Sequence, residues 1–254
     1  MIYDLLVTAV SERSDLFARS MASLLASVDI QPNRIIVHED VRPGSSPGEI
    51  AAWLSTCGLP FEHRVTSPAR GMGPGMLWCF EQATTPIVLY TQEDWGFVRP
   101  APIARCLDIM EANRLHHVRF NKRKTMVAKH ADTPNPWAKV EVRYLDSRGV
   151  PQTFCVSDHW YTQASLWRVD VALSGLRAAQ AHAGSSERFV ASFNAHMNTT
   201  HGDPARAWND QAMRDERLRT YIWGPVAEPR FIEHIGSQRG TGAIVYHLVP
   251  KGSP

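Results

Sequence analysis

Two pairs of adjacent carboxylates, Glu39-Asp40 and Glu93-Asp94, each follow a short run of apolar and β-branched residues. Such runs are typical of buried strands, and open parallel sheets bind ligands beside the carboxyl ends of their strands. Mg²⁺ and Mn²⁺ prefer carboxylate oxygens and complete their coordination with substrate phosphates. The pairs therefore predict a site for a divalent metal and a phosphorylated ligand. Solvated acidic turns are the alternative.

A glycine-rich segment, Gly71-Met72-Gly73-Pro74-Gly75, precedes a helix predicted at 76–83. Glycines before a helix allow a phosphate to approach the backbone N–H groups of its first turn. The segment follows the third predicted strand, and its spacing differs from that of a dinucleotide fingerprint. It is either a phosphate-binding loop or a plain turn between strand and helix.

Basic residues are concentrated between positions 112 and 131, where no acidic residue occurs. The six are Arg114, Arg119, Lys122, Arg123, Lys124 and Lys129. Such a stretch neutralises the phosphates of a nucleic-acid backbone, forms a solvated face, or binds a diphosphate. A nucleic acid is therefore one partner that the sequence predicts.

The elements that position these residues follow from hydrophobic periodicity. Strands are predicted at 2–10, 34–37, 61–66 and 86–90, and helices at 16–28, 49–57, 76–83 and 101–113. Strands alternating with helices predict a Rossmann-like, mostly parallel sheet with helices on both faces, which is an α/β fold. The second half is less regular, with strands at 116–121, 140–145, 220–224 and 230–235 and helices at 166–179 and 187–197. We expect one domain with a regular first half and an irregular second half.

Composition excludes several classes of protein. The 254 residues include 27 basic and 25 acidic side chains, and 44% of the chain is hydrophobic, which excludes a disordered chain, a collagen and a polycation. The four cysteines form no C-x-x-C pair, which argues against a disulfide framework or a structural zinc site. No P-loop, G-x-S-x-G elbow or H-E-x-x-H helix occurs. No signal-peptide pattern and no apolar stretch of about 18 residues is present, so the cytoplasm is the expected location and no membrane span is expected.

Three segments together resemble the opening half of GT-A fold glycosyltransferases of the family 2 type. They are Leu5-Leu6-Val7-Thr8-Ala9-Val10-Ser11-Glu12-Arg13, Arg34-Ile35-Ile36-Val37-His38-Glu39-Asp40, and Pro86-Ile87-Val88-Leu89-Tyr90-Thr91-Gln92-Glu93-Asp94-Trp95. The resemblance covers residues 2–113 and extends only loosely beyond. It implies a single GT-A-like domain in which 1–113 binds a nucleotide sugar and 114–254 supplies the acceptor-binding half and a C-terminal loop. The implied activity is sugar transfer from a nucleotide diphosphate donor, usually a UDP-sugar, to a hydroxyl group.

The resemblance also implies which residues contact the nucleotide. The loop that holds the base and ribose matches Thr8, Val10 and Glu12. Asp40 matches the acidic residue that reads the base. Arg70 or Gly71 lies where the family contacts the nucleotide before its next helix.

Metal binding is implied in the same way. Asp94 matches the metal-binding acid of a D-x-D-like motif, and Glu93 matches its neighbour facing the ribose or the metal. Gln92 departs from the motif because it stands in the first acidic position. His234 follows a late predicted strand and matches a histidine that many GT-A enzymes bring to Mn²⁺ or Mg²⁺. Arg239, in the Gly/Ser/Arg loop after it, is a candidate clamp for the diphosphate.

An inverting transfer needs a carboxylate that takes a proton from the acceptor hydroxyl. The family arrangement nominates Glu187 at the start of a predicted helix, with Asp158 in reserve. A glutamate that only complements the helix dipole is the alternative. Of the eight tryptophans, Trp95 and Trp160 are predicted near the site, where indole faces stack on sugars or bases. The predicted contacts to the acceptor are these two together with Arg119, Lys122, Arg123 and Lys124.

Two other functions remain open from the sequence. A nucleotidyltransferase also combines a Rossmann-like half with metal-binding carboxylates, although it usually has a glycine-rich basic loop after its first strand. A non-catalytic nucleic-acid-binding α/β module is supported only by the basic stretch. If a nucleic acid accepts the sugar, the acceptor is expected to be a hydroxylated base that is exposed or flipped from a duplex.

Overall fold

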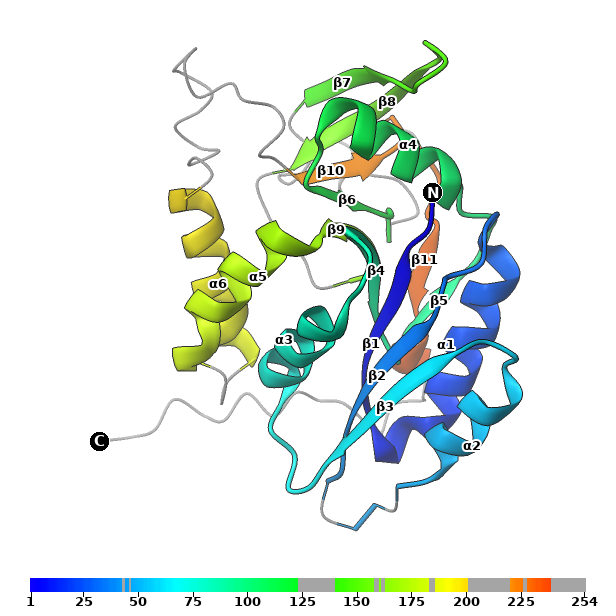
Figure 1. Ribbon diagram of the computed structural model, residues 1–254, viewed down its shortest axis with the longest axis vertical. Helices are drawn as coiled ribbons and strands as arrows, with labels where there is room; N and C mark the ends of the chain where they lie inside the picture. The colour runs from blue at the N-terminus through cyan, green and yellow to red at the C-terminus, as the bar shows by residue number, and fades with distance from the viewer. Residues whose placement is uncertain are drawn as a thin grey trace.

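The computed structural model describes most of the chain. The described residues are 1–42, 44–45, 47–122, 140–157, 160, 163–182, 186–200, 220–225 and 228–238. Within them, the chain forms a large twisted sheet with helices packed on each side (Figure 1).

The first half of the sheet is parallel, as predicted. Its strands are β1 (Asp4–Val10), β2 (Ile35–Asp40), β3 (Phe61–Thr66) and β4 (Ile87–Gln92). β1 lies between β2 and β4, and β3 forms the edge beside β2. Because these strands run in the same direction, their carboxyl ends meet at one edge of the sheet.

The second half continues the same sheet. Its strands are β6 (His117–Arg119), β7 (Val140–Leu145), β8 (Pro151–Ser157), β9 (Ser165–Arg168) and β10 (Thr220–Trp223). The complete order is β3-β2-β1-β4-β9-β6-β10-β8-β7. Among these strands only β9 and β8 run against the rest, so the sheet is mostly parallel.

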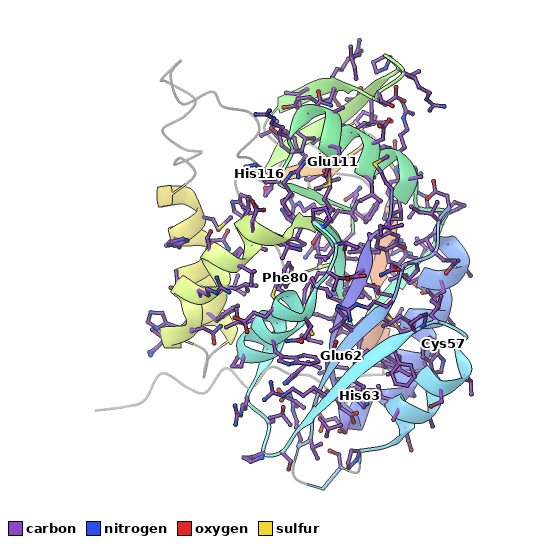
Figure 2. All side chains as sticks on the ribbon, in the orientation of Figure 1. Cys57, Glu62, His63, Phe80, Glu111 and His116 are labelled. Atoms are coloured by element: carbon purple, nitrogen blue, oxygen red, sulfur yellow. The ribbon has the colours of Figure 1, made fainter. Side chains whose placement is uncertain are left out.

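Two hydrophobic cores hold the helices against opposite faces of the sheet. The first core includes residues of α1 (Ser14–Ser27), α2 (Glu49–Thr56) and α4 (Ile103–Asn113), and the second includes residues of α3 (Met72–Gln82), α5 (Val169–Ala179) and α6 (Ser186–Thr200). Neighbouring β1 residues divide between them, with Leu5 and Val7 in the first core and Leu6 in the second, as the period of a strand requires. Phe80 of α3 contacts Tyr90 and Trp167, which lie on strands of the sheet (Figure 2). The predicted α/β fold is therefore confirmed.

Two parts of the second half differ from the prediction. Residues 166–168 belong to β9, and the helix predicted from 166 begins only with α5 at Val169. Leu166 packs in the first core and the adjacent Trp167 in the second, which a strand between two helical layers permits. β8 was not predicted.

A small second sheet was also not predicted. It pairs β5 (Trp95–Phe97) with β11 (Ile232–His234) in antiparallel register. Three 3₁₀ turns complete the described elements: η1 (Ser11–Arg13), η2 (Gln180–His182) and η5 (Ile235–Gln238). None of the helices in the described parts of the chain has the length and apolar character needed to cross a membrane.

Candidate nucleotide site

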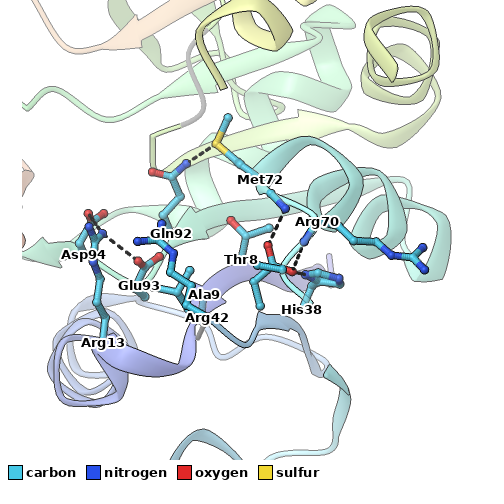
Figure 3. A pocket seen from close by; sticks show the side chains of 14 residues that line it. Thr8, Ala9, Arg13, His38, Arg42, Arg70, Met72, Gln92, Glu93 and Asp94 are labelled. Atoms are coloured by element: carbon cyan, nitrogen blue, oxygen red, sulfur yellow. Dashed lines mark hydrogen bonds and ion pairs between the residues drawn. The ribbon is translucent and has the colours of Figure 1, made fainter. Parts of the chain in front are cut away.

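A cavity of about 470 Å³ opens where β1, β2 and β4 end (Figure 3). Its walls come from these strand ends, from η1 and from the loop before α3. The lining residues are Thr8, Ala9, Val10, Arg13, His38, Asp40, Arg42, Ala69, Arg70, Gly71, Met72, Gln92, Glu93 and Asp94. Seven of them are residues that the sequence analysis assigned to the nucleotide or the metal.

Asp40 is fixed by the loop that leads into α3. Its Oδ1 accepts a hydrogen bond from the backbone N–H of Arg70 (3.1 Å), and its Oδ2 accepts one from Gly71 (2.8 Å). The residue is only 5% exposed. Each carboxylate oxygen has a second lone pair, so the anchored side chain can still accept a hydrogen bond from a ligand in the cavity.

Glu39, beside Asp40, points away from this cavity because successive strand residues face opposite sides. Its Oε1 accepts the Ser11 hydroxyl (2.5 Å), and its Oε2 lies 2.8 Å from His63 Nε2. Burial raises the pKa of Glu39, but the hydrogen bonds from His63 and Ser11 outweigh it and hold the pKa below its ordinary value. One member of this acidic pair therefore lines the cavity and the other braces β2 against β3.

His38 is a wall residue that the sequence analysis did not select. Its Nε2 lies 3.0 Å from the Thr66 hydroxyl, and a Cβ at Gly75 would lie 2.6 Å from its Nδ1. Glycine at position 75 therefore lets α3 pack directly over the imidazole. Burial lowers the pKa of His38, although the nearby Asp40 carboxylate opposes the shift.

Glu93 and Asp94 share one guanidinium group. Arg13 Nη1 lies 3.0 Å from Glu93 Oε1 and 3.2 Å from Asp94 Oδ2. Both carboxylates are nearly excluded from solvent. Burial and the adjacent Asp94 carboxylate raise the pKa of Glu93 to about 7, although Arg13 opposes the shift.

His234 reaches the same carboxylate from the far end of the sequence. Antiparallel pairing places it opposite Trp95, and its Nε2 lies 2.9 Å from Asp94 Oδ2. A Cβ at Gly236 would lie 3.4 Å from both Asp94 Oδ2 and His234 Cε1, so the turn after β11 is closely packed on the pair.

These residues fit a divalent cation. Asp94 Oδ1 is buried and has no hydrogen-bond partner among the described residues. A carboxylate beside an imidazole is a suitable ligand pair for Mn²⁺ or Mg²⁺, with diphosphate oxygens completing the coordination. No group of three or more His, Cys, Asp or Glu side chains suited to a metal occurs in the described parts of the chain.

The predicted acceptor residues divide between the site and the core. Trp95 contacts the His234 ring edge-on at 5.0 Å between centroids, and Lys122 Nζ lies 5.5 Å from the centre of the Trp95 ring. These contacts connect Lys122, three residues after the end of β6, to the Asp94–His234 pair. Trp160 instead packs in the second core, and Arg119 is buried in β6.

The remaining predicted residues lie at the margin of the cavity or beyond the described residues. Glu12 does not line the cavity and lies 2.7 Å from Arg42, which does. Asp158, Arg123, Lys124 and Arg239 lie outside the described residues.

Glu187 lies in the first turn of α6, and the structure does not describe its side chain. Phe189, two positions later, lies against Gly73, where a Cβ would be 2.6 Å from its ring. The start of α6 therefore contacts the start of α3, next to the Gly71–Met72 wall.

Sequence reasoning missed several cavity residues, Arg13 and Gln92 among them. Arg13 stands in the resembling segment that follows β1, but only its approach to β4 reveals its two carboxylate partners. Gln92, the departure from the acidic motif, donates a hydrogen bond to the Met72 thioether and helps to close the cavity toward α3.

Comparison by sequence finds no matching protein-family model and no matching curated protein. Comparison by structure finds S. aureus TarS, whose 1-349 crystal structure has a TM-score of 0.57 at 11% identity. The match covers 92% of this chain and 60% of that one. The same TarS fragment in complex with UDP-GlcNAc gives a TM-score of 0.55 at 12% identity, covering 93% of this chain and 61% of that one.

A second similar structure is the mannosyltransferase PcManGT from Pyrobaculum calidifontis, in complex with GDP-Man and Mn²⁺. Its TM-score is 0.52 at 13% identity, with 93% of this chain and 58% of that chain covered. The chain thus spans about 60% of the length of the structures that it matches. These similarities extend across both halves of the sheet, and the chain has the GT-A fold.

Proposed function

We propose that this protein is a glycosyltransferase that moves a sugar from a nucleotide diphosphate donor to a hydroxyl group. One observation carries the proposal: residues from three strand ends that were assigned to a nucleotide and its metal line one cavity of about 470 Å³. That volume is in the range of small-molecule sites. The GT-A fold supports the same reaction class.

The way in which the donor nucleotide would bind is inferred from the residues that line the cavity. Asp40, held by two backbone N–H groups, offers a fixed acceptor for an N–H on a base such as uracil. Thr8 and Val10 form the adjoining wall, where the ribose is expected. A UDP-sugar is the donor that we propose, since TarS has been crystallised with UDP and with UDP-GlcNAc.

Asp94 and His234 would hold Mn²⁺ or Mg²⁺ together with the diphosphate. The cation supplies positive charge where the departing diphosphate gains negative charge. Arg13 and Arg70 line the same cavity and offer further donors to phosphate oxygens. Gln92 contributes no charge at the position where the motif usually has an acid, so Asp94 carries the metal-binding role.

The acceptor half of the proposal rests on the other end of the site. Glu187, in the first turn of α6, is the proposed base for an inverting transfer, with Asp158 in reserve. Lys122 and Trp95 lie where an acceptor would approach the Asp94–His234 pair. We extend the proposal to a hydroxylated base in nucleic acid as acceptor, because Lys122 belongs to the basic stretch at 112–131 and is followed directly by Arg123 and Lys124.

The donor site is tested by calorimetric titration of the protein with UDP, GDP, CDP and ADP, each with and without Mn²⁺. We expect one nucleotide to bind with Mn²⁺-dependent affinity, and Asp94→Asn to weaken it at least tenfold, because the carboxylate that holds the cation is neutralised. Asp108→Asn is the matched control, since Asp108 is an α4 carboxylate that bonds Ser147 away from the cavity. A screen for hydrolysis of nucleotide sugars then identifies the donor.

Indifference to all four nucleotides in the folded protein would contradict the proposal. Binding of a nucleoside triphosphate with release of pyrophosphate would instead indicate a nucleotidyltransferase. For the acceptor, salt-sensitive binding of DNA or RNA in a mobility-shift titration is expected, and its absence would remove nucleic acid from the proposal.

A further inference from the structure

Asp94 Oδ2 is contacted by two side chains that a metal would have to accommodate. Arg13 Nη1 lies 3.2 Å from it and His234 Nε2 lies 2.9 Å from it. The same Nη1 also lies 3.0 Å from Glu93 Oε1, so one guanidinium nitrogen joins the two carboxylates. The Arg13 side chain is 15% exposed, which makes this a largely desolvated ion pair.

We propose that Arg13 is a resident counter-cation that competes with the divalent metal for Asp94 and makes metal binding depend on the nucleotide diphosphate. The inference rests on the proposed function and assigns to this arginine a role in the order of ligand binding. Without nucleotide, Arg13 occupies Asp94 and the metal binds weakly. With nucleotide, the diphosphate offers Arg13 another anion in the same cavity, and Asp94 is released to the metal.

The charges at the site support this competition. Glu93 and Asp94 are the acids at the end of β4, and Arg13 neutralises one of their two formal charges before any ligand arrives. A divalent cation approaching Asp94 therefore meets a positive charge within contact distance of its ligand oxygen. At such a short range in a desolvated site, this repulsion is strong.

The position of Arg13 in the fold gives it access to both partners. It ends η1, directly after β1, and both it and the strand end Thr8–Val10 line the cavity. A diphosphate bound beside that strand end is within the volume that Arg13 already borders. Arg42 lines the same cavity, but its partner is Glu12 and its side chain is 49% exposed. It therefore offers a matched arginine without a contact to Glu93 or Asp94.

The test measures Mn²⁺ binding directly, by electron paramagnetic resonance of the free aqua ion, with and without saturating UDP. GDP replaces UDP if the calorimetric screen selects it. The variants are Arg13→Gln, Glu93→Gln, the double variant Arg13→Gln/Glu93→Gln, and Arg42→Gln. The double variant guards against misfolding, because it removes one acid together with the arginine and keeps the formal charge of the wild-type cluster.

Without nucleotide, we expect Arg13→Gln to tighten Mn²⁺ binding at least fivefold relative to wild type. The double variant should tighten it by a similar factor relative to Glu93→Gln, and Arg42→Gln should change it less than twofold. The factor by which UDP tightens Mn²⁺ binding should shrink in both variants that lack Arg13. UDP binding without metal should weaken in the same two variants, because the diphosphate loses a guanidinium partner.

Unchanged or weaker Mn²⁺ binding in the folded Arg13 variants would overturn the inference and leave Arg13 a structural brace. An equal effect of Arg42→Gln would also overturn it, because the cause would then be the net charge of the cavity. Failure of the wild type to bind Mn²⁺ even with UDP would refute the metal assignment of the proposed function and this inference together. The wild-type titration thus distinguishes the two failures.

Discussion

Adjacent residues of similar chemistry take different roles at this site because a strand alternates its faces. Asp40 lines the cavity and is held by the N–H groups of Arg70 and Gly71, whereas Glu39 is buried against Ser11 and His63. Glu93 and Asp94, in the turn after β4, both line the cavity because the strand has ended. Backbone geometry thus brings one acid of the first pair and both acids of the second pair to the cavity.

His117 is buried in the core, and its surroundings determine its protonation state. Its ring is stacked on Trp160 at 5.2 Å between centroids and lies 3.8 Å from the centroid of Trp167. Neither ring nitrogen has a hydrogen-bond partner among the described residues. Burial lowers the pKa of His117 well below its ordinary value, and the nearby Arg119 lowers it further. The folded protein therefore keeps this imidazole neutral.

A pH-dependent loss of stability follows from this. Above about pH 6.5 His117 is neutral in both folded and unfolded chains, so it adds no pH dependence to the stability in that range. Below that pH the unfolded chain takes up a proton that the folded chain does not, so stability falls by up to about 1.4 kcal/mol per pH unit from this group. His117→Phe, which keeps an aromatic ring in the stack, should flatten the dependence in urea unfolding measured from pH 7 to pH 5. An identical slope in the two proteins would contradict the assignment.

At the scale of elements, α3 packs against both β2 and α6, and the loop before it forms part of the cavity wall. Gly75 allows it to pack on His38 of β2, and Gly73 allows it to pack on Phe189 of α6. The loop before it supplies the N–H groups that hold Asp40. Glycines in the first turns of α3 therefore allow the helix to pack closely on both neighbours.

Gly75→Ala tests this packing. Alanine normally stabilises a helix interior by about 0.5–1 kcal/mol relative to glycine. Here the new Cβ would lie 2.6 Å from His38 Nδ1, so we expect a net loss of about 1–3 kcal/mol in the free energy of unfolding.

Adding His38→Ala should relieve the clash, so that Gly75→Ala costs less in that background. The comparison is a double-mutant cycle measured by urea unfolding. Additive costs of the two substitutions would show that the imidazole is not what excludes a side chain from position 75.

The small β5–β11 sheet positions His234 beside Asp94. Its register brings His234 opposite Trp95, and the following turn places Gly236 against Asp94. The backbone N–H of Ile235 also donates to Asp94 O (2.9 Å). A three-residue strand thereby delivers the histidine to the carboxylate.

For the whole molecule, the boundary at residue 113 between the two halves of the sequence is not a boundary in the sheet, which contains strands of both halves. β9 of the second half lies between β4 of the first half and β6, and both cores contain residues of both halves. Residues 1–113 therefore share their core with residues 114–254, as expected for two halves of one domain.

This shared core predicts a single cooperative unfolding transition. Far-UV circular dichroism and tryptophan fluorescence should give the same urea midpoint, because the tryptophans lie in both halves. Trp53 belongs to the first half and Trp167 to the second, so the fluorescence lost in Trp53→Phe or in Trp167→Phe, relative to wild type, gives the contribution of one tryptophan from each half. Two resolved midpoints would show that the halves unfold independently.

Much of the donor half could be predicted from the sequence because its information is local. Runs such as 86–90 have the periodicity of buried strands, and their ends locate Thr8, Asp40 and Asp94 at one edge of a parallel sheet. The alternation of strands and helices determined the fold class by the same local signals. The strands β5 and β9 escaped prediction because three or four residues give little periodicity, and β8 was also not predicted.

Only the tertiary structure decided which side chains meet. Arg13 joins Glu93 and Asp94 across about 80 positions of sequence, and His234 reaches Asp94 across 140. The contacts of Glu39 with Ser11 and His63, the burial of Trp160 and the packing of α3 on His38 were decided in the same way. Local propensity determines an element, but the contacts between elements depend on packing over long loops, and no local pattern encodes that pairing.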